Sequence, residues 1–116
     1  MAVDEGLYAW VRESLEPLGP VSMRKMMGGA TLYLDGVIFA VIDESELWFK
    51  ADAETNAIWD AEGCERFTFI GGDGRTESMN YRRAPAGVYD DPEAMRRWAA
   101  LAREAGTRAA STRKKR

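Results

Sequence analysis

The alternation of apolar and polar positions along the chain predicts three helices and five strands. Over residues 4–18, apolar side chains recur every three or four positions with charged side chains opposite, which is the pattern of an amphipathic helix. A second helix is expected over 52–62, begun by Asp52, and a third from residue 92, ended by Gly106. Runs of strand-forming residues between turns are expected as strands at 30–34, 37–42, 47–50, 66–70 and 75–81.

The order of these elements, α-β-β-β-α-β-β-α, predicts an α+β domain in which helices pack on an antiparallel sheet. At the first hairpin, Asp35-Gly36 is typical of a type I′ turn, so a positive φ is expected at Gly36. Residues 71–74 are expected as a second hairpin turn and not as a phosphate loop, because they join strand to strand. We expect one domain over 1–105 and a basic, flexible tail over 106–116.

The first hairpin is apolar on both of its faces. An uninterrupted register puts one set of side chains on one face: Leu34 with Val37, Leu32 with Phe39, and Ala30 with Val41. The other face then carries a second apolar set, Tyr33, Ile38, Ala40 and Ile42, joined either by Trp48 or by Leu47 and Phe49. A sheet with one solvated face alternates apolar with polar residues, so either a helix covers each face or the second face meets a partner. We expect a self-association face at Tyr33, Ile38 and Ile42.

Charge divides the chain unevenly. The 116 residues carry 16 basic and 19 acidic side chains, a net charge of −3. Five basic residues lie in the last eleven positions without any acid: Arg108, Arg113, Lys114, Lys115 and Arg116. Without them, 11 basic residues face 19 acidic ones, so the rest of the chain is near −8. An acidic body argues against a nucleic-acid groove in the domain itself, whereas the tail is able to contact phosphate.

The sequence offers no recognisable catalytic or metal-binding set. Histidine is absent, which removes the usual general base near pH 7 and the commonest metal ligand. Cys64 is the only thiol and is expected to be a small, half-buried residue, because no partner base accompanies it. Ser22 and Lys25 match a four-residue acylation pattern, S-x-x-K, but the further motifs of that chemistry are missing. We therefore expect no enzyme activity, no cofactor and no metal.

Basic residues also recur near the ends of the expected strands, where two interpretations stay open. They either converge into one binding patch or are scattered, solvated charges. The residues concerned are Arg24, Lys25, Lys50, Arg82 and Arg83. The lone cysteine, the acidic start at Asp4-Glu5 and the lack of a long apolar run predict a cytoplasmic protein without membrane contact.

Several short motifs, in order along the chain, carry a resemblance to a known family. They are Met26-Met27-Gly28-Gly29, Leu32-Tyr33-Leu34-Asp35-Gly36, Phe39-Ala40, Leu47-Trp48-Phe49-Lys50, Met79-Asn80-Tyr81, Pro85, Asp91-Pro92-Glu93 and Trp98-Ala99. From residue 21 to about 105 the chain resembles the TfoX (Sxy) N-terminal domain family. The resemblance implies a two-layer α-β(3)-α-β(2)-α domain whose related folds include secretion chaperones, which often dimerise. It also implies a regulator of DNA-uptake competence that acts in transcription, with no catalytic residue to carry over.

Three functions remain as hypotheses at this point. The first is a non-enzymatic regulatory or protein-interaction module that binds a protein partner or a second copy of itself. The alternative is a nucleic-acid-associated factor that uses the basic tail and the strand-end arginines. A small-molecule binder or enzyme comes last, because no acid–base or nucleophile set is visible.

Overall fold

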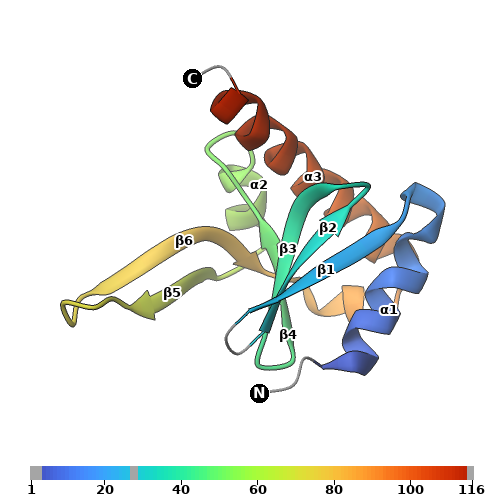
Figure 1. Ribbon diagram of the computed structural model, residues 1–116, viewed down its shortest axis with the longest axis horizontal. Helices are drawn as coiled ribbons and strands as arrows, with labels where there is room; N and C mark the ends of the chain where they lie inside the picture. Colours follow the sequence, from blue (N-terminus) through green and yellow to red (C-terminus); the bar gives the residue numbers. More distant parts are fainter. Residues whose placement is uncertain (1–3, 27–28, 115–116) are drawn as a thin grey trace.

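The computed structural model describes residues 4–26 and 29–114, which form an α+β fold of a six-stranded antiparallel sheet with its helices on one face (Figure 1). Met27 and Gly28 of the family-like motif, and Lys115 and Arg116 of the basic tail, lie outside the described residues. In chain order the elements are α1 (Glu5–Leu15), η1 (Glu16–Leu18), β1 (Val21–Met26), β2 (Gly29–Leu34), β3 (Val37–Asp43), β4 (Glu46–Lys50), α2 (Asn56–Ala61), β5 (Arg66–Ile70), β6 (Thr76–Arg83), η2 (Ala86–Tyr89) and α3 (Pro92–Lys114).

The strands lie in the order β1-β2-β3-β4-β6-β5, and every neighbouring pair is antiparallel. The sequence pattern predicts five of them, and β1 is the addition. It pairs with β2 along its whole length, from Val21 opposite Leu34 to Met26 opposite Gly29. The pattern misses β1 because Val21 is the only buried residue in this polar edge strand.

The first hairpin has the predicted turn but a different register. Asp35 and Gly36 both have positive φ, 52° and 81°, as a type I′ turn requires. Beyond Tyr33, which pairs with Ile38, the register shifts so that Leu32 lies opposite Ala40 and Ala30 opposite Ile42. The expected pairs of Leu32 with Phe39 and Ala30 with Val41 are therefore wrong, because a β-bulge at Phe39 inserts one extra residue into β3.

The bulge decides which side chains the helices cover. Beyond it the alternation of β3 is reversed, so Ala40 and Ile42 lie with Leu32 on the helix-covered face and are almost fully buried. From β4, Leu47 and Phe49 join this face, because they pair with Ile42 and Ala40. Trp48 lies on the opposite face, so of the two alternatives for the second apolar face, Trp48 or Leu47 with Phe49, the structure has Trp48.

Aromatic side chains connect the sheet to α2 and α3 at the centre of the core. Phe49 stacks on Trp59 of α2 with ring centroids 5.7 Å apart, and Trp59 contacts Trp98 of α3 at 4.9 Å. Such pairs contribute about 0.5–1.5 kcal/mol beyond the burial of their area. The predicted stripe of α1 also enters this core, through Leu7, Val11 and Leu15.

The sequence pattern predicts that the last helix ends at Gly106. This is wrong, because α3 continues to Lys114. Gly106 is needed for close packing: a Cβ at this position would collide with the backbone carbonyl oxygen of Ile38 and lie 3.0 Å from Val37 Cγ1. The missing side chain lets α3 lie directly on β3. No helix in the described part of the chain is long and apolar enough to span a membrane.

Candidate functional site

The sheet face without helices, called the open face from here on, is aromatic at its centre. The register places one row of paired residues across it, Arg24, Thr31, Val41, Trp48 and Arg83. Trp48 is only 7% exposed, although none of the helices in residues 4–26 and 29–114 covers this face. Phe67 of β5 meets its ring edge-on at 4.9 Å, and the Arg83 guanidinium lies 5.1 Å from its centroid.

The β5–β6 hairpin, called the arm from here on, extends the open face beyond the body of the molecule (Figure 1). Strand β4 pairs only with residues 81–83 of β6, so the outer part of the arm consists of two strands. Its side chains are largely exposed, including Phe69 (39%), Met79 (45%) and Ile70 (68%). Phe69 and Met79 lie on the open face of the arm, whereas Ile70 lies on its other face, because side chains alternate along β5. Large apolar side chains are usually buried, and their exposure on a projecting hairpin is typical of an interaction surface.

A small apolar groove runs between the arm and the ends of β1 and β3. Its walls include Met26, Val41, Phe67, Met79 and Tyr81, and its volume is about 70 Å³. Sites for small molecules usually measure about 300–1,000 Å³. This groove therefore fits one inserted side chain better than a free ligand.

The three residues expected to form a self-association face do not lie on the same side of the sheet. Tyr33 and Ile38 pair with each other on the open face, where both are partly buried. Ile42 is 2% exposed within the helix-covered core, so its expected place on the second face is wrong; the bulge at Phe39 is the cause. Tyr81 also lies on the open face, two residues before Arg83 in β6. Burial raises the pKa of its hydroxyl, and the phenol of Tyr33 adds to that shift.

The strand-end cations are dispersed over the sheet. Arg24 and Arg83 end the row across the open face, separated by four strand spacings or about 19 Å. Lys25 is exposed and lies on the opposite side of β1 from Arg24. Lys50 Nζ lies 5.0 Å from the centroid of the Tyr81 ring.

The two neighbouring arginines of β6 have different surroundings. Arg83 is half-exposed and forms ion pairs with Glu46 at 3.2 Å and Glu65 at 3.4 Å. Arg82 faces the helices and is 1% exposed, so it cannot belong to a surface patch with Arg83. Its guanidinium donates to Asp60 at 2.8 Å, to the Cys64 carbonyl at 2.9 Å and to Asn56 at 3.2 Å. Arg82 thus joins α2 and its following loop to the sheet.

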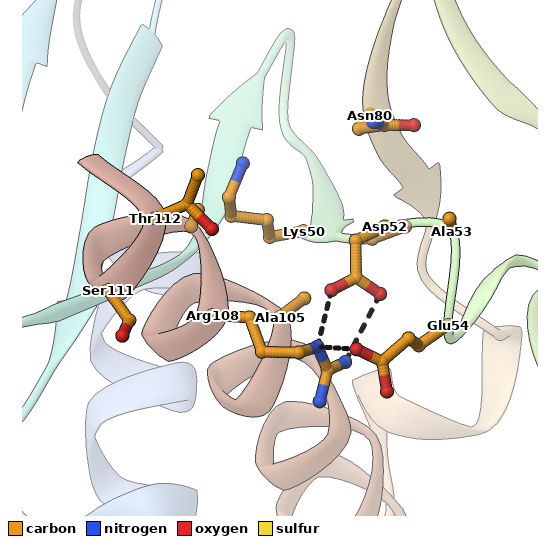
Figure 2. Close-up of a pocket in the computed structure, with 11 residues that line it drawn as sticks. Lys50, Asp52, Ala53, Glu54, Asn80, Ala105, Arg108, Ser111 and Thr112 are labelled. Carbon is orange, nitrogen blue, oxygen red and sulfur yellow. Dashed lines mark hydrogen bonds and ion pairs between the residues drawn. The ribbon is translucent and has the colours of Figure 1, made fainter. Parts of the chain in front are cut away.

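A polar hollow lies where α3 passes the end of β4, and Figure 2 shows its residues. The Arg108 guanidinium donates to both carboxylate oxygens of Asp52, at 2.7 and 3.1 Å, and contacts Glu54 at 3.2 Å. The hydrogen bonds from Arg108 hold the pKa of Asp52 below its usual value. The hollow, about 460 Å³, is large enough for a small molecule, but Arg108 is already bound by two carboxylates of the same chain. It is better explained as a contact that fixes α3.

The candidate nucleophiles are not arranged for catalysis. Ser22 pairs with Tyr33 on the open face, whereas Lys25 lies three positions on and therefore faces the other side of β1. Cys64 is buried, and burial raises the pKa of its thiol, with Glu62 adding to the shift. Within residues 4–26 and 29–114, no three Cys, Asp or Glu side chains gather as a metal site would require.

The sequence predicts the β5–β6 hairpin, with its turn at residues 71–74, but not its projection from the body or its exposed aromatic face. The burial of Arg82 and the contact of Arg108 with Asp52 are not predicted either. The alternation in Phe67-x-Phe69 and Met79-x-Tyr81 is the signal that would have revealed one aromatic face of the arm. The other two contacts join residues 18–56 positions apart and leave no local pattern.

Comparison with known proteins gives the same family that the sequence motifs resemble. No curated protein matches the chain. The family model described as the TfoX N-terminal domain matches residues 6–106, which include α1 except for Glu5, every element from η1 to η2, and more than half of α3. The chain therefore belongs to the TfoX N-terminal domain family.

Proposed function

We propose that this domain is a non-enzymatic, regulatory protein-interaction module that binds its partner through the open face and the arm. The observation that carries this proposal is the exposure of Phe69 and Met79 on the open face of the arm, together with the exposure of Ile70 on its other face. Burying such side chains against a partner contributes about 25 cal/mol for each Å² of apolar area removed from water. Because the chain belongs to the TfoX N-terminal domain family, we include a role in competence or transcription in this proposal.

The small groove beside the arm supports a protein partner over a free metabolite. Its apolar walls and volume of about 70 Å³ suit one anchoring side chain, as at the centre of many protein interfaces. Among the described residues, Asp43 is the one charged residue in its wall, at the end of β3, where it would contribute to the polar rim that protein interfaces usually have.

The alternative of a nucleic-acid-associated factor has weaker support. Nucleic-acid binding needs several cations that face the phosphates together. Arg82 and Arg83 are paired with acids, and Arg108 of the expected tail binds Asp52 and Glu54. Nothing in the described residues favours this function over protein binding.

A pair of matched surface variants tests the proposal. Met79 on the arm and Ile58 on α2 are almost equally exposed, at 45% and 46%, and lie on different faces. The wild-type protein is used to capture partners from its native cells, and each partner is then purified for titration calorimetry. We expect Met79→Glu to weaken binding about tenfold or more, because a charge would be buried, and Ile58→Glu to leave it unchanged. Equal affinity of Met79→Glu and wild type for every purified partner would contradict the proposal.

A further inference from the structure

The outer edge of β5 is an unprotected strand edge. Strand β5 is the last in the sheet order, and in the described part of the chain no strand pairs with its outer side. Proteins usually protect such an edge with lysine, proline or an acid, because it otherwise pairs with another strand. The opposite edge strand, β1, has Arg24 and Lys25, whereas β5 has Arg66 at its start and then Phe67, Thr68, Phe69 and Ile70.

The arm is also too narrow to be stable through its own pairing. A two-stranded ribbon is only marginally stable in water, and three or more strands or a covering helix are normally needed. Residues 76–79 of β6 pair with β5 alone, and their side chains are exposed. An added strand on the outer edge of β5 would widen the ribbon from two strands to three or more.

The hydrogen-bonding pattern fixes which residues of β5 point outward. The Gly71 N–H donates to the Arg75 carbonyl at 2.8 Å, so these residues form a hydrogen-bonded pair at the end of the arm. In an antiparallel ladder such pairs alternate with pairs whose backbone groups point away from each other. Counting back from Gly71, the backbone N–H and C=O groups of Thr68 and Ile70 point outward.

The sequence of β5 is self-complementary around Thr68. If a second copy of β5 pairs antiparallel with Thr68 opposite Thr68, Phe67 lies opposite Phe69 of the other copy, and Arg66 lies opposite Ile70. This register pairs the outward-pointing residues with each other, and it is one that a twofold axis allows. It also places all four phenylalanines on the open face of one continuous sheet.

The charges of the arm allow two copies to approach. Between residues 66 and 80 the arm has two cations, Arg66 and Arg75, and two acids, Asp73 and Glu77, so its net charge is zero. The chain as a whole carries −3, so the arm is a region where two copies meet without net repulsion.

We infer that the first partner of the arm is a second copy of this chain, bound by antiparallel pairing of β5 with β5 around Thr68. The inference rests on the proposed function, for which it names the partner and the contact. A monomeric protein would overturn the β5 pairing alone, because the Met79→Glu titration measures binding to the partners captured from cells and does not depend on self-association.

Two variants test the pairing by sedimentation velocity from micromolar to high micromolar concentration. Thr68→Pro removes an outward N–H and leaves the β5–β6 ladder in place, because proline is tolerated on the solvent side of an edge strand. We expect the wild type to dimerise and Thr68→Pro to associate about tenfold more weakly or worse, with an unchanged circular dichroism spectrum. Ile58→Lys, an equally drastic change on α2, should dimerise like the wild type. A wild type that stays monomeric overturns the inference, as does a folded Thr68→Pro protein that dimerises fully.

Disulfide formation gives a second readout that does not depend on the proline variant. In a Cys64→Ala background, Thr68→Cys should form a disulfide-linked dimer under mild oxidation, because the two Cα atoms would lie about 5.5 Å apart. The matched Ser78→Cys variant, one strand inward, should not, because its two copies would lie about 14 Å apart. Equal cross-linking at both positions, or none at Thr68→Cys, would overturn the pairing.

Discussion

Arg108 and Asp52 lie 56 positions apart in the sequence and form a bidentate ion pair, with nitrogen–oxygen distances of 2.7 and 3.1 Å. Arg108 belongs to the part of α3 that follows Gly106, and Asp52 belongs to the loop between β4 and α2. The same carboxylate accepts the Thr55 N–H at 3.1 Å, which organises the turn before α2. Asp52 therefore connects the end of α3 to the start of α2.

We expect Asp52→Asn to lower the free energy of unfolding by about 1 kcal/mol at pH 7, because asparagine keeps the turn but loses the ion pair. Since Arg108 lowers the folded-state pKa of Asp52, the stabilisation is fully present above the unfolded value near 4 and is lost as the pH falls through the folded value. Urea unfolding between pH 7 and pH 2.5 measures this. The difference between Asp52→Asn and wild type should be constant above about pH 5 and shrink below pH 4.

An exposed carboxylate provides the control for that titration. Asp73 lies at the tip of the arm and contacts Arg75 at 3.7 Å, with both side chains mostly exposed. Asp73→Asn should change the free energy of unfolding by less than about 0.5 kcal/mol. If Asp52→Asn shows the same small effect at every pH, the ion pair does not fix α3.

Gly106→Ala should destabilise the protein although alanine is the better helix former. The helix preference of alanine is worth about 1 kcal/mol, but the new Cβ would collide with the Ile38 carbonyl, and such overpacking costs about 1–3 kcal/mol. We expect a net loss of about 1 kcal/mol in chemical denaturation. Gly6→Ala in α1 is the matched control. Its Cβ would lie no closer than 3.6 Å to a neighbouring atom, Asp4 Oδ1, so this substitution should stabilise the protein by about 0.5 kcal/mol.

Arg82→Ala and Arg83→Ala should differ strongly although the two residues are neighbours. The Arg82 side chain is 2% exposed, and its removal leaves the Cys64 carbonyl without a donor and a cavity beneath α2, at a cost of about 3 kcal/mol. Arg83 is 44% exposed, and its ion pairs should contribute no more than about 1 kcal/mol. Thermal and urea unfolding of the two variants give the comparison, and equal losses would contradict the buried role of Arg82.

Features that depend on neighbouring residues could be predicted from the sequence. The Asp35-Gly36 turn follows from the backbone conformation that glycine allows, and the first helix follows from its apolar period. The motifs of the family and the element order were sufficient for the fold class, which the structure confirms.

Features that depend on packing between distant elements could not be predicted. The bulge at Phe39 changes the face of Ile42, and nothing in the alternation of β3 marks it. A glycine such as Gly106 is typical of a helix end, but here it lies inside α3, where it allows the close approach of α3 to β3. Arg82 and Arg83 look identical in the sequence, and only the position of α2 distinguishes the buried one from the exposed one.

Cys64 should react slowly with thiol reagents in the native protein, because it is 9% exposed and burial raises the pKa of its thiol, which lowers the fraction of reactive thiolate. We expect its reaction with a disulfide reagent at pH 8 to be about a hundredfold slower than in urea, limited by local opening of the structure. Because Arg82 donates to the Cys64 carbonyl, Arg82→Ala should accelerate the native reaction, whereas Arg83→Ala should not. A native rate equal to that of the unfolded chain would mean that Cys64 is accessible, and it would reopen the question of a nucleophilic role for this thiol.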